Sequence, residues 1–541
     1  MARYILILAQ AFLLGGITAC QQVPSVRFDI DARRDVKPIS RYIYGINQFH
    51  GVVDGLEGPY SNLTFTRLGG NRFTAYNWTN NASNAGSDYF FHNDDYLVDG
   101  DLFKGIQLVP GGAVIPTLDV GYRHNAAVLL TIPINGYVAA DKLAHASVRD
   151  SGANYLQTRF KPERPRKNAA FTLTPDPNAP LVYQDEFVNW VKTKCPYAQT
   201  DLDRPIWFSM DNEPAWWTQA HLEVHPQPVT YAELVGQTIA YASAVKDVMG
   251  STLIFGPANY GWFGYVALQG APDGGGRDFH EYYLQRMAEA EKSFGRRLLD
   301  VLDVHWYPEA QGGGVRIMGS HTTTAPSVSA ARMQAPRSLW DPTYSEVSWI
   351  TEKSIGAPIR LIPRLKDKID KCYPGTKLAI SEYYFGAGND ISGGIAQADA
   401  LGIFGREGLF AAAIWPDENK MPFVDGAFQM YRDFDGKNGT FGDISVRAQT
   451  GDIEKCSVYA SLDSRNGGRM IVVLINKTNR PLQANMRFHN ADRFDRADVY
   501  QLTSARPVPQ PAGIVKIDGR HCLDYVMPAF SVTTLQLGDG S

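Results

Sequence analysis

The sequence predicts an α/β fold, in which a (β/α)8 TIM barrel is followed by a C-terminal all-β sandwich. Three observations support this prediction. Short β-type runs alternate with longer helical runs from residue 42 to about 415, eight such β-type runs occur there, and only β-type runs follow after about Phe428. Strand–helix alternation is typical of parallel strands, and eight of them close a barrel. The 541 residues are enough for a barrel of ~250 residues or more and a second domain.

The eight candidate barrel strands are short and mostly apolar. In chain order they are Tyr42–Ile46, Thr64–Arg67, Ala127–Ile132, Ile206–Met210, Leu253–Gly256, Val301–His305, Leu378–Ser381 and Ala412–Trp415. The helical patterns between them are Glu186–Lys194, Tyr231–Met249, Phe279–Leu299, Ile359–Cys372 and Ile395–Phe410. The first two strand–helix units show weak helical patterns, so their strands are better supported than their helices.

The last part of the chain has the pattern of a β-sandwich. Its candidate strands are Ser457–Leu462, Met470–Asn476, Ala497–Leu502, Ile514–Ile517 and Ser531–Leu537, and Asn466-Gly467 is typical of a hairpin turn. The early run Val26–Ile30 can pair either with this domain or with the barrel. All ten tryptophans lie between Trp78 and Trp415, so the β domain contains none, which favours a structural role over separate sugar binding.

The N-terminus has the pattern of a secretory signal peptide. Arg3 precedes a mostly apolar run, Ile5 to Ala19, which is shorter than the ~18–20 residues of a membrane span. The run ends in Ile17-Thr18-Ala19-Cys20, which resembles the bacterial lipobox, whose cysteine is lipidated. An ordinary signal peptide cleaved near Ala19 is the alternative. Gln21, rather than Asp, follows the cysteine and favours the outer membrane.

We therefore expect an exported protein, an outer-membrane lipoprotein of a Gram-negative bacterium or otherwise a secreted or periplasmic protein. The expected domains are a signal peptide (1–19), a tether with the first sandwich strand (20–40), the catalytic barrel (41–427) and the β-sandwich (428–541). Contact with the membrane is expected only through the lipid on Cys20, and the protein is expected to be a monomer. A net charge of −4 argues against nucleic acid as a partner.

Four cysteines remain beyond Cys20, namely Cys195, Cys372, Cys456 and Cys522. They form no C-x-x-C pair, so a zinc site is not expected. An oxidising compartment permits disulfides. Cys456 with Cys522 is the favoured pair because both fall in one late segment, although the sequence does not settle the pairing.

The sharpest chemical signal is a carboxylate at the end of the fourth candidate strand. The segment is Trp207-Phe208-Ser209-Met210-Asp211-Asn212-Glu213-Pro214. Because Pro cannot continue the strand ladder, the chain turns there and Glu213 lies at the C-terminal mouth of the barrel, where active sites of this fold occur. An apolar, aromatic setting raises the pKa of a carboxyl, as a general acid requires. The alternative is a Glu that caps the next helix or pairs with an Arg.

A second carboxylate follows the seventh candidate strand, in Leu378-Ala379-Ile380-Ser381-Glu382-Tyr383-Tyr384. Taken alone, Glu382 is best interpreted as a solvated residue at a strand end. Together, Glu213 and Glu382 face one another across the mouth, and two flanking carboxylates are what glycoside hydrolysis requires. We expect Glu382 to be the nucleophile and Glu213 the acid/base, with their carboxyl groups about 5–5.5 Å apart.

Other polar and aromatic residues at strand ends, or in the segments that follow them, are candidates for substrate binding. They are Arg67, Asn71, Trp78, Asn212, His305, Trp306, Tyr307 and Trp415. The Trp side chains can stack on the apolar faces of pyranose rings, although core packing is the alternative for each of them. The segment from Glu309 to Ile350, rich in Gly, Ser and Thr, is predicted to be a loop over the mouth.

A rival signal is the metal-type spacing of His221 and His225. Leu222 stands where the H-E-x-x-H motif has Glu, and Pro226 and Pro228 favour a loop rather than a helix. A metal-dependent hydrolase using His221, His225 and His305 is therefore a minor alternative.

Several separated motifs resemble those of glycoside hydrolase family 44. They are Asp211-Asn212-Glu213-Pro214-Ala215-x-Trp217 with His221 and His225-Pro226, Gly69-Gly70-Asn71-x-x-Thr74-x-Tyr76-Asn77-Trp78, Ile132-Pro133 through Gly136-Tyr137-Val138-Ala139-Ala140-Asp141-Lys142, and Ser381-Glu382-Tyr383. The resemblance runs from about residue 26 to the C-terminus. It implies a barrel joined to a sandwich whose strands come from both chain ends, and retaining endo-hydrolysis of β-1,4-glucans, including xyloglucan, carboxymethylcellulose and mixed-linkage glucan.

The resemblance also carries over Glu213 as acid/base and Glu382 as nucleophile. It implies no cofactor for catalysis, while some members bind a structural calcium, whose ligands the sequence does not identify. A mannanase or xylanase on the same scaffold, and a non-catalytic glycan-binding lipoprotein, are the alternative functions.

Overall fold

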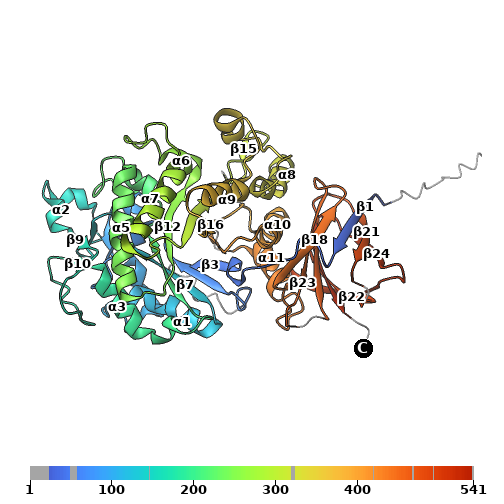
Figure 1. The fold of residues 1–541 in the computed structure, drawn as a ribbon, viewed down its shortest axis with the longest axis horizontal. Coiled ribbons are helices and arrows are strands. Elements are labelled where there is room, and N and C mark those ends of the chain that lie inside the picture. The colour runs from blue at the N-terminus through green and yellow to red at the C-terminus, as the bar shows by residue number, and fades with distance from the viewer. Residues whose placement is uncertain are drawn as a thin grey trace, which may run out of the picture.

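The computed structural model describes residues 23–48, 58–144, 146–318, 323–417, 420–465, 468–491 and 493–538. The signal peptide, Cys20 and the Asn466-Gly467 turn lie outside the described residues. Figure 1 shows a barrel surrounded by helices and, beside it, a β domain formed mainly by the C-terminal strands. No helix among the described residues is both long and apolar enough to cross a membrane.

Eight parallel strands close the barrel, as the sequence predicts. They are β3 (Gly45–Gln48), β4 (Phe65–Leu68), β7 (Ala127–Ile132), β11 (Ile206–Met210), β12 (Ile254–Tyr260), β13 (Val301–Trp306), β16 (Lys377–Tyr383) and β17 (Ala411–Ile414). The last strand pairs with the first, with Ala413 opposite Gly45. Barrel strands are covered on both faces, which explains why they are nearly continuous apolar runs.

The inward and outward faces of the strands pack in two separate cores. A small cluster inside the barrel includes Phe65, Leu129, Trp207, Val301 and Ala379. The outward residues pack against the helices in a much larger cluster. Because side chains alternate along a strand, the cluster in which a residue lies tells which face it occupies.

The helices that cover the barrel begin and end at recognisable signals. Thr230 and Glu233 form a capping box at the start of α5 (Tyr231–Val248), and Asp278 caps α7 (Phe279–Phe294), which ends at Gly295 with a φ of 67°. The other helices are α1 (Ile115–His124), α2 (Tyr155–Thr158), α3 (Gln184–Lys194), α4 (Trp217–Ala220), α6 (Gly261–Ala267), α8 (Pro326–Gln334), α9 (Leu361–Cys372), α10 (Ile391–Glu407) and α11 (Pro422–Arg432).

The segment predicted as a loop from Glu309 to Ile350 is partly regular, so that prediction is wrong over part of its length. It contains β14 (Gln311–Gly312), β15 (Val315–Arg316) and the helix α8. Pro326 occupies the first turn of α8, where a missing N–H costs nothing, and Val328 and Met333 are buried. The helix was not predicted because most of its residues are small or polar and only a narrow side of it is apolar.

Small sheets extend from the mouth of the barrel. They pair β5 (Ser83–Asn84) with β6 (Asn93–Asp94), and β8 (Tyr137–Ala139) with β9 (Phe160–Arg164) and β10 (Val182–Tyr183).

The β domain contains an N-terminal strand. Strand β1 (Ser25–Asp31) pairs with β18 (Ile444–Thr450) and β21 (Leu482–His489), so the early apolar run belongs to this domain and not to the barrel. In Figure 1, β1 is the blue strand among the orange and red ones. The remaining strands are β2 (Lys37–Pro38), β19 (Cys456–Leu462), β20 (Met470–Asn476), β22 (Arg496–Thr503), β23 (Arg506–Lys516), β24 (Cys522–Met527) and β25 (Ser531–Gly538).

Strand β18 passes from one sheet of the sandwich to the other. Residues 444–446 pair with β19, whereas residues 447–450 pair with β1. The core between the sheets includes Phe28, Leu474, Met486 and Leu535. Strands β18, β21 and β24 were not predicted from the sequence, although β21 alternates buried and less buried residues as a half-covered strand should.

The favoured disulfide is wrong, because all four cysteines within the described part of the chain are free. Cys456 begins β19, and its thiol donates to the carbonyl of Asp452 at 3.3 Å. Cys522 begins β24, and its sulfur lies 3.7 Å from the carbonyl oxygen of Arg520. Proximity along the chain did not bring them together because their strands belong to different sheets of the sandwich.

A buried ion pair joins the barrel to the β domain. Lys477 Nζ lies 2.7 Å from Asp399 Oδ2 of α10, and both side chains are 1% exposed. The Tyr459 hydroxyl donates to Asp399 Oδ1 at 2.7 Å. A buried charge without its partner is costly, so the loss of either member of this pair should lower the free energy of unfolding.

We expect Lys477→Met to lower the free energy of unfolding by about 3–5 kcal/mol, because it leaves Asp399 buried without a counter-ion. Urea-induced unfolding followed by fluorescence measures the change. Lys455→Ala is the matched control, since Lys455 pairs with Asp452 at the surface and is 55% exposed, and it should leave the unfolding midpoint unchanged. Equal midpoints for the two variants would contradict a role for the buried pair.

Candidate active site

The turn after β11 holds two non-glycine residues in the left-handed conformation. Asp211 has a φ of 65° and Glu213 a φ of 48°. The Asp211 carboxylate accepts hydrogen bonds from the Thr74 hydroxyl at 2.6 Å and the Ile134 N–H at 2.7 Å. The Glu213 N–H donates to the carbonyl of Ala258 at 3.0 Å. Such a conformation costs about 1–3 kcal/mol per residue and persists where surrounding contacts enforce it, commonly at active sites.

Glu213 occupies the position before the short helical turn Pro214–Trp216, but its side chain makes no capping hydrogen bond. Its Oε1 lies 2.7 Å from His305 Nδ1 instead, and 24% of the side chain is exposed. Burial raises the pKa of Glu213 to about 8. The charge of Arg67 acts to lower this pKa, and the charge of Asp88 acts to raise it. The capping alternative therefore does not apply, and the carboxyl group holds a proton at neutral pH.

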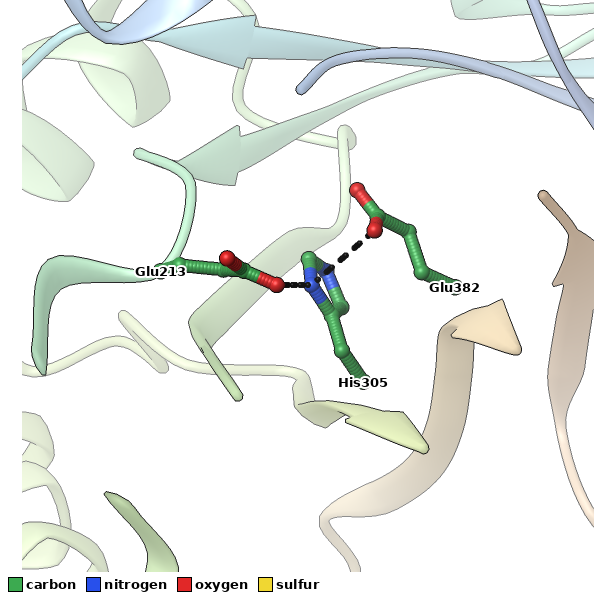
Figure 2. A group of neighbouring side chains, drawn as sticks. All are labelled: Glu213, His305 and Glu382. Atoms are coloured by element: carbon green, nitrogen blue, oxygen red, sulfur yellow. Dashed lines mark hydrogen bonds and ion pairs between the residues drawn. The ribbon is translucent and has the colours of Figure 1, made fainter. Parts of the chain in front are cut away.

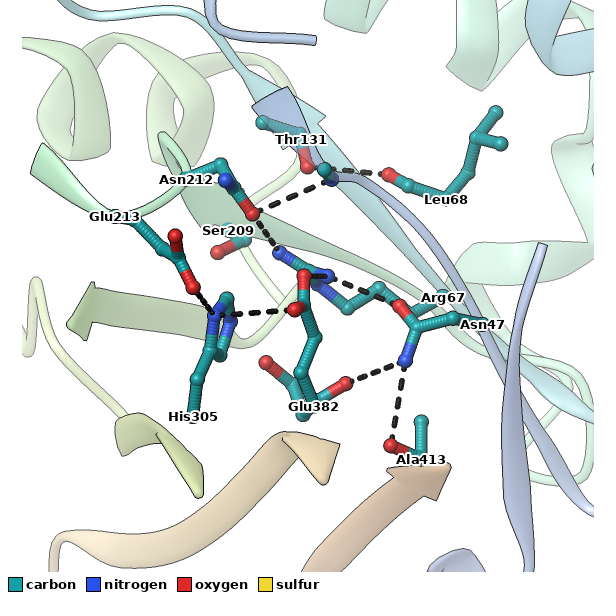
Figure 3. Close-up of polar contacts among 12 residues, drawn as sticks. Asn47, Arg67, Leu68, Thr131, Ser209, Asn212, Glu213, His305, Glu382 and Ala413 are labelled. Atoms are coloured by element: carbon teal, nitrogen blue, oxygen red, sulfur yellow. Dashed lines mark hydrogen bonds and ion pairs between the residues drawn. The ribbon is translucent and has the colours of Figure 1, made fainter. Parts of the chain in front are cut away.

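Glu382 lies at the end of β16 and is not solvated, since only 6% of its side chain is exposed. Its Oε1 accepts a hydrogen bond from Arg67 at 2.6 Å, and its Oε2 accepts one from the Tyr307 hydroxyl at 2.9 Å. The Arg67 side chain is fully buried and also donates to Asn47 Oδ1 at 2.9 Å and Asn212 Oδ1 at 2.7 Å (Figure 3). A guanidinium and a phenol on separate oxygens orient the carboxylate and stabilise its charge.

His305 stands between the two carboxyl groups (Figure 2). Its Nδ1 is 2.7 Å from Glu213 Oε1 and 3.4 Å from Glu382 Oε2. Burial lowers the pKa of His305 to about 4, while the charge of Glu382 acts in the opposite direction. The imidazole is therefore neutral at neutral pH, and the proton of this pair resides on Glu213. One oxygen of each carboxyl group and a ring nitrogen all lie within 4.8 Å of one another.

Six of the eight residues predicted to bind substrate lie at the site, in two groups. Arg67, Asn212, His305 and Tyr307 meet in the network around the two carboxyl groups, whereas Asn71 and Trp415 line cavities at the mouth. One cavity of about 460 Å³ contains Glu213, Trp216 and Tyr260. The other, of about 430 Å³, contains Trp415, Gly70 and Tyr96, and both are also lined by Asn71 and Asp88.

Trp78 and Trp306 do not reach these cavities, so their prediction as sugar-binding residues is wrong. Trp78 is 1% exposed, donates from its indole N–H to the carbonyl of Tyr183 and packs on Phe187. Trp306 is 2% exposed because it follows His305 on β13, and alternation turns the side chain that follows an inward residue toward the helices.

The sequence analysis also missed residues that the site uses. Asn47, at the end of β3, binds Arg67 and the ends of two neighbouring strands. A polar side chain directly after an apolar strand was the available signal. Trp216 ends the short helical turn after Glu213 and Tyr260 is the last residue of β12. Their ring centroids are 5.7 Å apart, and only the fold brings them together.

The metal-dependent alternative finds no support within the described ranges. His221 contacts the backbone carbonyl of Asn71 and the carboxylate of Glu223, and His225 contacts the carboxylate of Glu233. Neither forms a cluster with His305. Among the described residues, one group of three acidic, His or Cys side chains is spaced closely enough to hold a metal ion. It consists of Glu213, His305 and Glu382. It does not fit a calcium ion, which takes oxygen ligands, because one member is an imidazole and Glu382 already pairs with Arg67.

Comparison with known proteins agrees with this geometry. Residues 82–310 match the model of glycoside hydrolase family 44. An endoglucanase A from Paenibacillus lautus is 39% identical over 519 residues, which cover 94% of this chain and 71% of the relative. The chain belongs to glycoside hydrolase family 44.

Two further relatives extend the comparison. A solved structure of a Paenibacillus polymyxa family 44 xyloglucanase with xyloglucan superposes on this chain with a TM-score of 0.88 and 39% identity, covering 95% of this chain and all of that one. A β-mannanase/endoglucanase A from Caldicellulosiruptor saccharolyticus is 38% identical over 532 residues, which cover 94% of this chain. The match covers only 38% of that relative's length. The predicted family and fold class are thus confirmed.

Proposed function

We propose that the protein is a retaining endo-hydrolase of β-1,4-glucan backbones, including xyloglucan, with Glu213 as acid/base and Glu382 as nucleophile. The observation that carries the proposal is the approach of the two carboxyl groups, which have one oxygen each within 4.8 Å at the barrel mouth. Retaining enzymes hold them about 5–5.5 Å apart, whereas inverting enzymes leave ~6.5–9.5 Å for a water molecule. The names of the relatives as endoglucanase and xyloglucanase support the choice of substrate.

In the first step, Glu382 attacks the anomeric carbon while Glu213 protonates the departing glycosidic oxygen. The bond from sugar to leaving group breaks as the ester to Glu382 forms. Arg67 and Tyr307 hold the two Glu382 oxygens, so the carboxylate meets the sugar in one orientation. The raised pKa of Glu213 leaves it protonated at neutral pH for this step.

In the second step, the ionised Glu213 takes a proton from water, whose oxygen attacks the anomeric carbon and releases Glu382. His305 stays 2.7 Å from Glu213 and is neutral, so it orients the carboxyl group without adding a charge. Two inversions at one carbon retain the β configuration.

The glucan chain would cross both cavities of the mouth. The one that contains Glu213, Trp216 and Tyr260 lies on the side of the acid and suits the departing sugar. The one with Trp415 suits the sugars that stay attached. Asn212 is held through its carbonyl oxygen, so its amide N–H groups are what it offers to a sugar hydroxyl.

The test is a reducing-sugar assay on xyloglucan, carboxymethylcellulose, mixed-linkage glucan, glucomannan and xylan. We expect release from the three glucans, with a rapid fall in viscosity that reports endo cleavage. NMR of the first products from cellohexaose should show the β-anomer. An initial α-anomer would refute retention, and no release from any polymer would favour a non-catalytic glycan-binding protein.

A mannanase is the second candidate, because one relative carries that activity in its name. Faster release from glucomannan than from every glucan would favour it, and fastest release from xylan would favour a xylanase. We further propose that the protein is a monomer exported as an outer-membrane lipoprotein through Cys20, on the basis of the lipobox-like sequence.

A further inference from the structure

Strand β16 carries one extra residue just before the proposed nucleophile. Against β13, Val304 is opposite Ile380 but His305 is opposite Glu382, so Ser381 has no counterpart. Against β17, Ala412 is opposite Ile380 and Ile414 is opposite Tyr383, which also leaves one residue too many. Both neighbouring strands therefore place a β-bulge between Ile380 and Tyr383.

The bulge decides which way Glu382 points. Ala379 lies in the cluster inside the barrel, and Ile380 lies in the cluster that faces the helices. Regular alternation would then place Ser381 inside, Glu382 outside and Tyr383 inside. Tyr383 instead faces outward and accepts a hydrogen bond from Gln397 of α10 at 3.0 Å. The extra residue allows Ser381 and Glu382 to face the barrel interior one after the other.

Side chains from two other strands hold the bulge. The Ser381 N–H donates to Asp303 Oδ1 at 3.1 Å, and its hydroxyl donates to Asp303 Oδ2 at 2.7 Å. The Ser381 carbonyl accepts a hydrogen bond from Asn47 Nδ2 at 2.7 Å. A bulge removes its extra residue from the ladder, and buried backbone groups need partners, so these bonds replace what the strand pairing cannot supply.

The same groups reach Glu382 from a second direction. Asn47 accepts a hydrogen bond from Arg67, which binds Glu382 Oε1 (Figure 3). Asp303 is fully buried on β13, two residues before His305 and on the same face. The proposed nucleophile is thus oriented both through its backbone and through its carboxylate by one connected set of bonds.

We infer that Asp303, together with Asn47, is a positioning residue that locks the Ser381 bulge and thereby aims Glu382 at the anomeric carbon. This inference rests on the proposed function, in which Glu382 is the nucleophile. Asp303 does not touch the substrate. Its loss should therefore slow the attack by Glu382 and leave substrate binding intact.

Covalent trapping measures that attack directly. With 2,4-dinitrophenyl 2-deoxy-2-fluoro-β-cellobioside, Glu382 forms an ester to the anomeric carbon and dinitrophenolate departs, which intact-mass spectrometry follows over time. Asp303→Asn keeps the shape but loses one acceptor, and we expect trapping about 100-fold slower, the scale of a small misplacement of a reacting group, with an unchanged concentration for half-saturation. Asp300→Asn is the control. Asp300 directly precedes β13 at the opposite end of the barrel, where it binds Lys246 and the Ile254 N–H, and this variant should trap at the wild-type rate.

A double variant distinguishes the loss of Glu382 orientation from a general distortion of the barrel. Azide restores activity to Glu382→Gly without using Glu382, so adding Asp303→Asn should change the rescued rate by less than about two-fold. A rescued rate that falls as far as the trapping rate would overturn the inference, as would wild-type trapping by Asp303→Asn. If Asp303→Asn does not fold, Ser381→Ala, which removes one of the two bonds to Asp303, should slow trapping about ten-fold, and no slowing would overturn the inference. Failure of the wild type to be labelled at Glu382 would instead refute the proposed function.

Discussion

Glu382→Gly is expected to lose nearly all hydrolysis of glucan, by a factor on the order of 10⁴–10⁶, and azide is expected to restore activity on an activated aryl β-cellobioside. The variant leaves Arg67 and Tyr307 in place around a space where the carboxylate stood. Azide can enter that space and attack the anomeric carbon from the same face. Because only one inversion then occurs, the product should be α-cellobiosyl azide.

NMR of the azide product gives its anomeric configuration, and the α configuration shows that the replaced residue was the nucleophile. The control is Glu407→Gly, at the C-terminal end of α10, where Glu407 lies beside Arg406 and far from the mouth. It should keep wild-type hydrolysis and show no response to azide. Recovery of the β-azide from Glu382→Gly, or hydrolysis within ten-fold of the wild type, would remove Glu382 from the nucleophile's role.

Glu213→Ala should show a loss that depends on the leaving group. Hydrolysis of cellohexaose needs protonation of a poor leaving group and is expected to fall by about 10²–10⁴. Formation of the covalent intermediate from 2,4-dinitrophenyl β-cellobioside needs no such help and should change little. Azide should then give the β-azide, because it attacks the ester that Glu382 has already formed.

The pH profile provides an independent test of Glu213. Its pKa is raised to about 8, and the protonated form is the active one in the first step. Wild-type kcat/KM should therefore be high below this pH and fall as the pH rises through about 8. In Glu213→Gln this alkaline limb should be absent, while Glu407→Gln should retain it. An alkaline limb that persists in Glu213→Gln would assign it to another group.

The carboxyl groups themselves were predictable because each follows a local signal. The fourth barrel strand ends at Met210, and Pro214 prevents the ladder from continuing beyond Glu213, while an apolar run leads directly to Glu382. Both signals depend only on the periodicity of a strand and on the missing N–H of Pro, and neither needs a distant contact. The eight barrel strands were predictable for the same reason, since strands covered on both faces form short apolar runs.

Residues whose role depends on a distant partner were not predictable. Trp306 ends a barrel strand and Trp78 lies in the segment that follows the second one. Contacts with Tyr183 and Phe187 bury Trp78, and the helical layer buries Trp306, so neither reaches the mouth. Cys456 and Cys522 fall in one late segment of the chain, but β19 and β24, which begin with them, belong to different sheets of the sandwich.

The sequence by itself determined the family, the barrel with its β domain, and the two glutamates at strand ends, because these follow from short-range patterns of polarity and from turn chemistry. Only the tertiary structure showed what turns Glu382 toward the mouth and which contacts bury Glu213 and raise its pKa. A regular strand would turn Glu382 toward the helices, and the bulge at Ser381 that prevents this is held by side chains from β3 and β13. The pKa of Glu213 likewise depends on burial that residues far along the chain create. Hydrogen bonds and desolvation of this kind exist only after distant segments have met, so no local pattern encodes them.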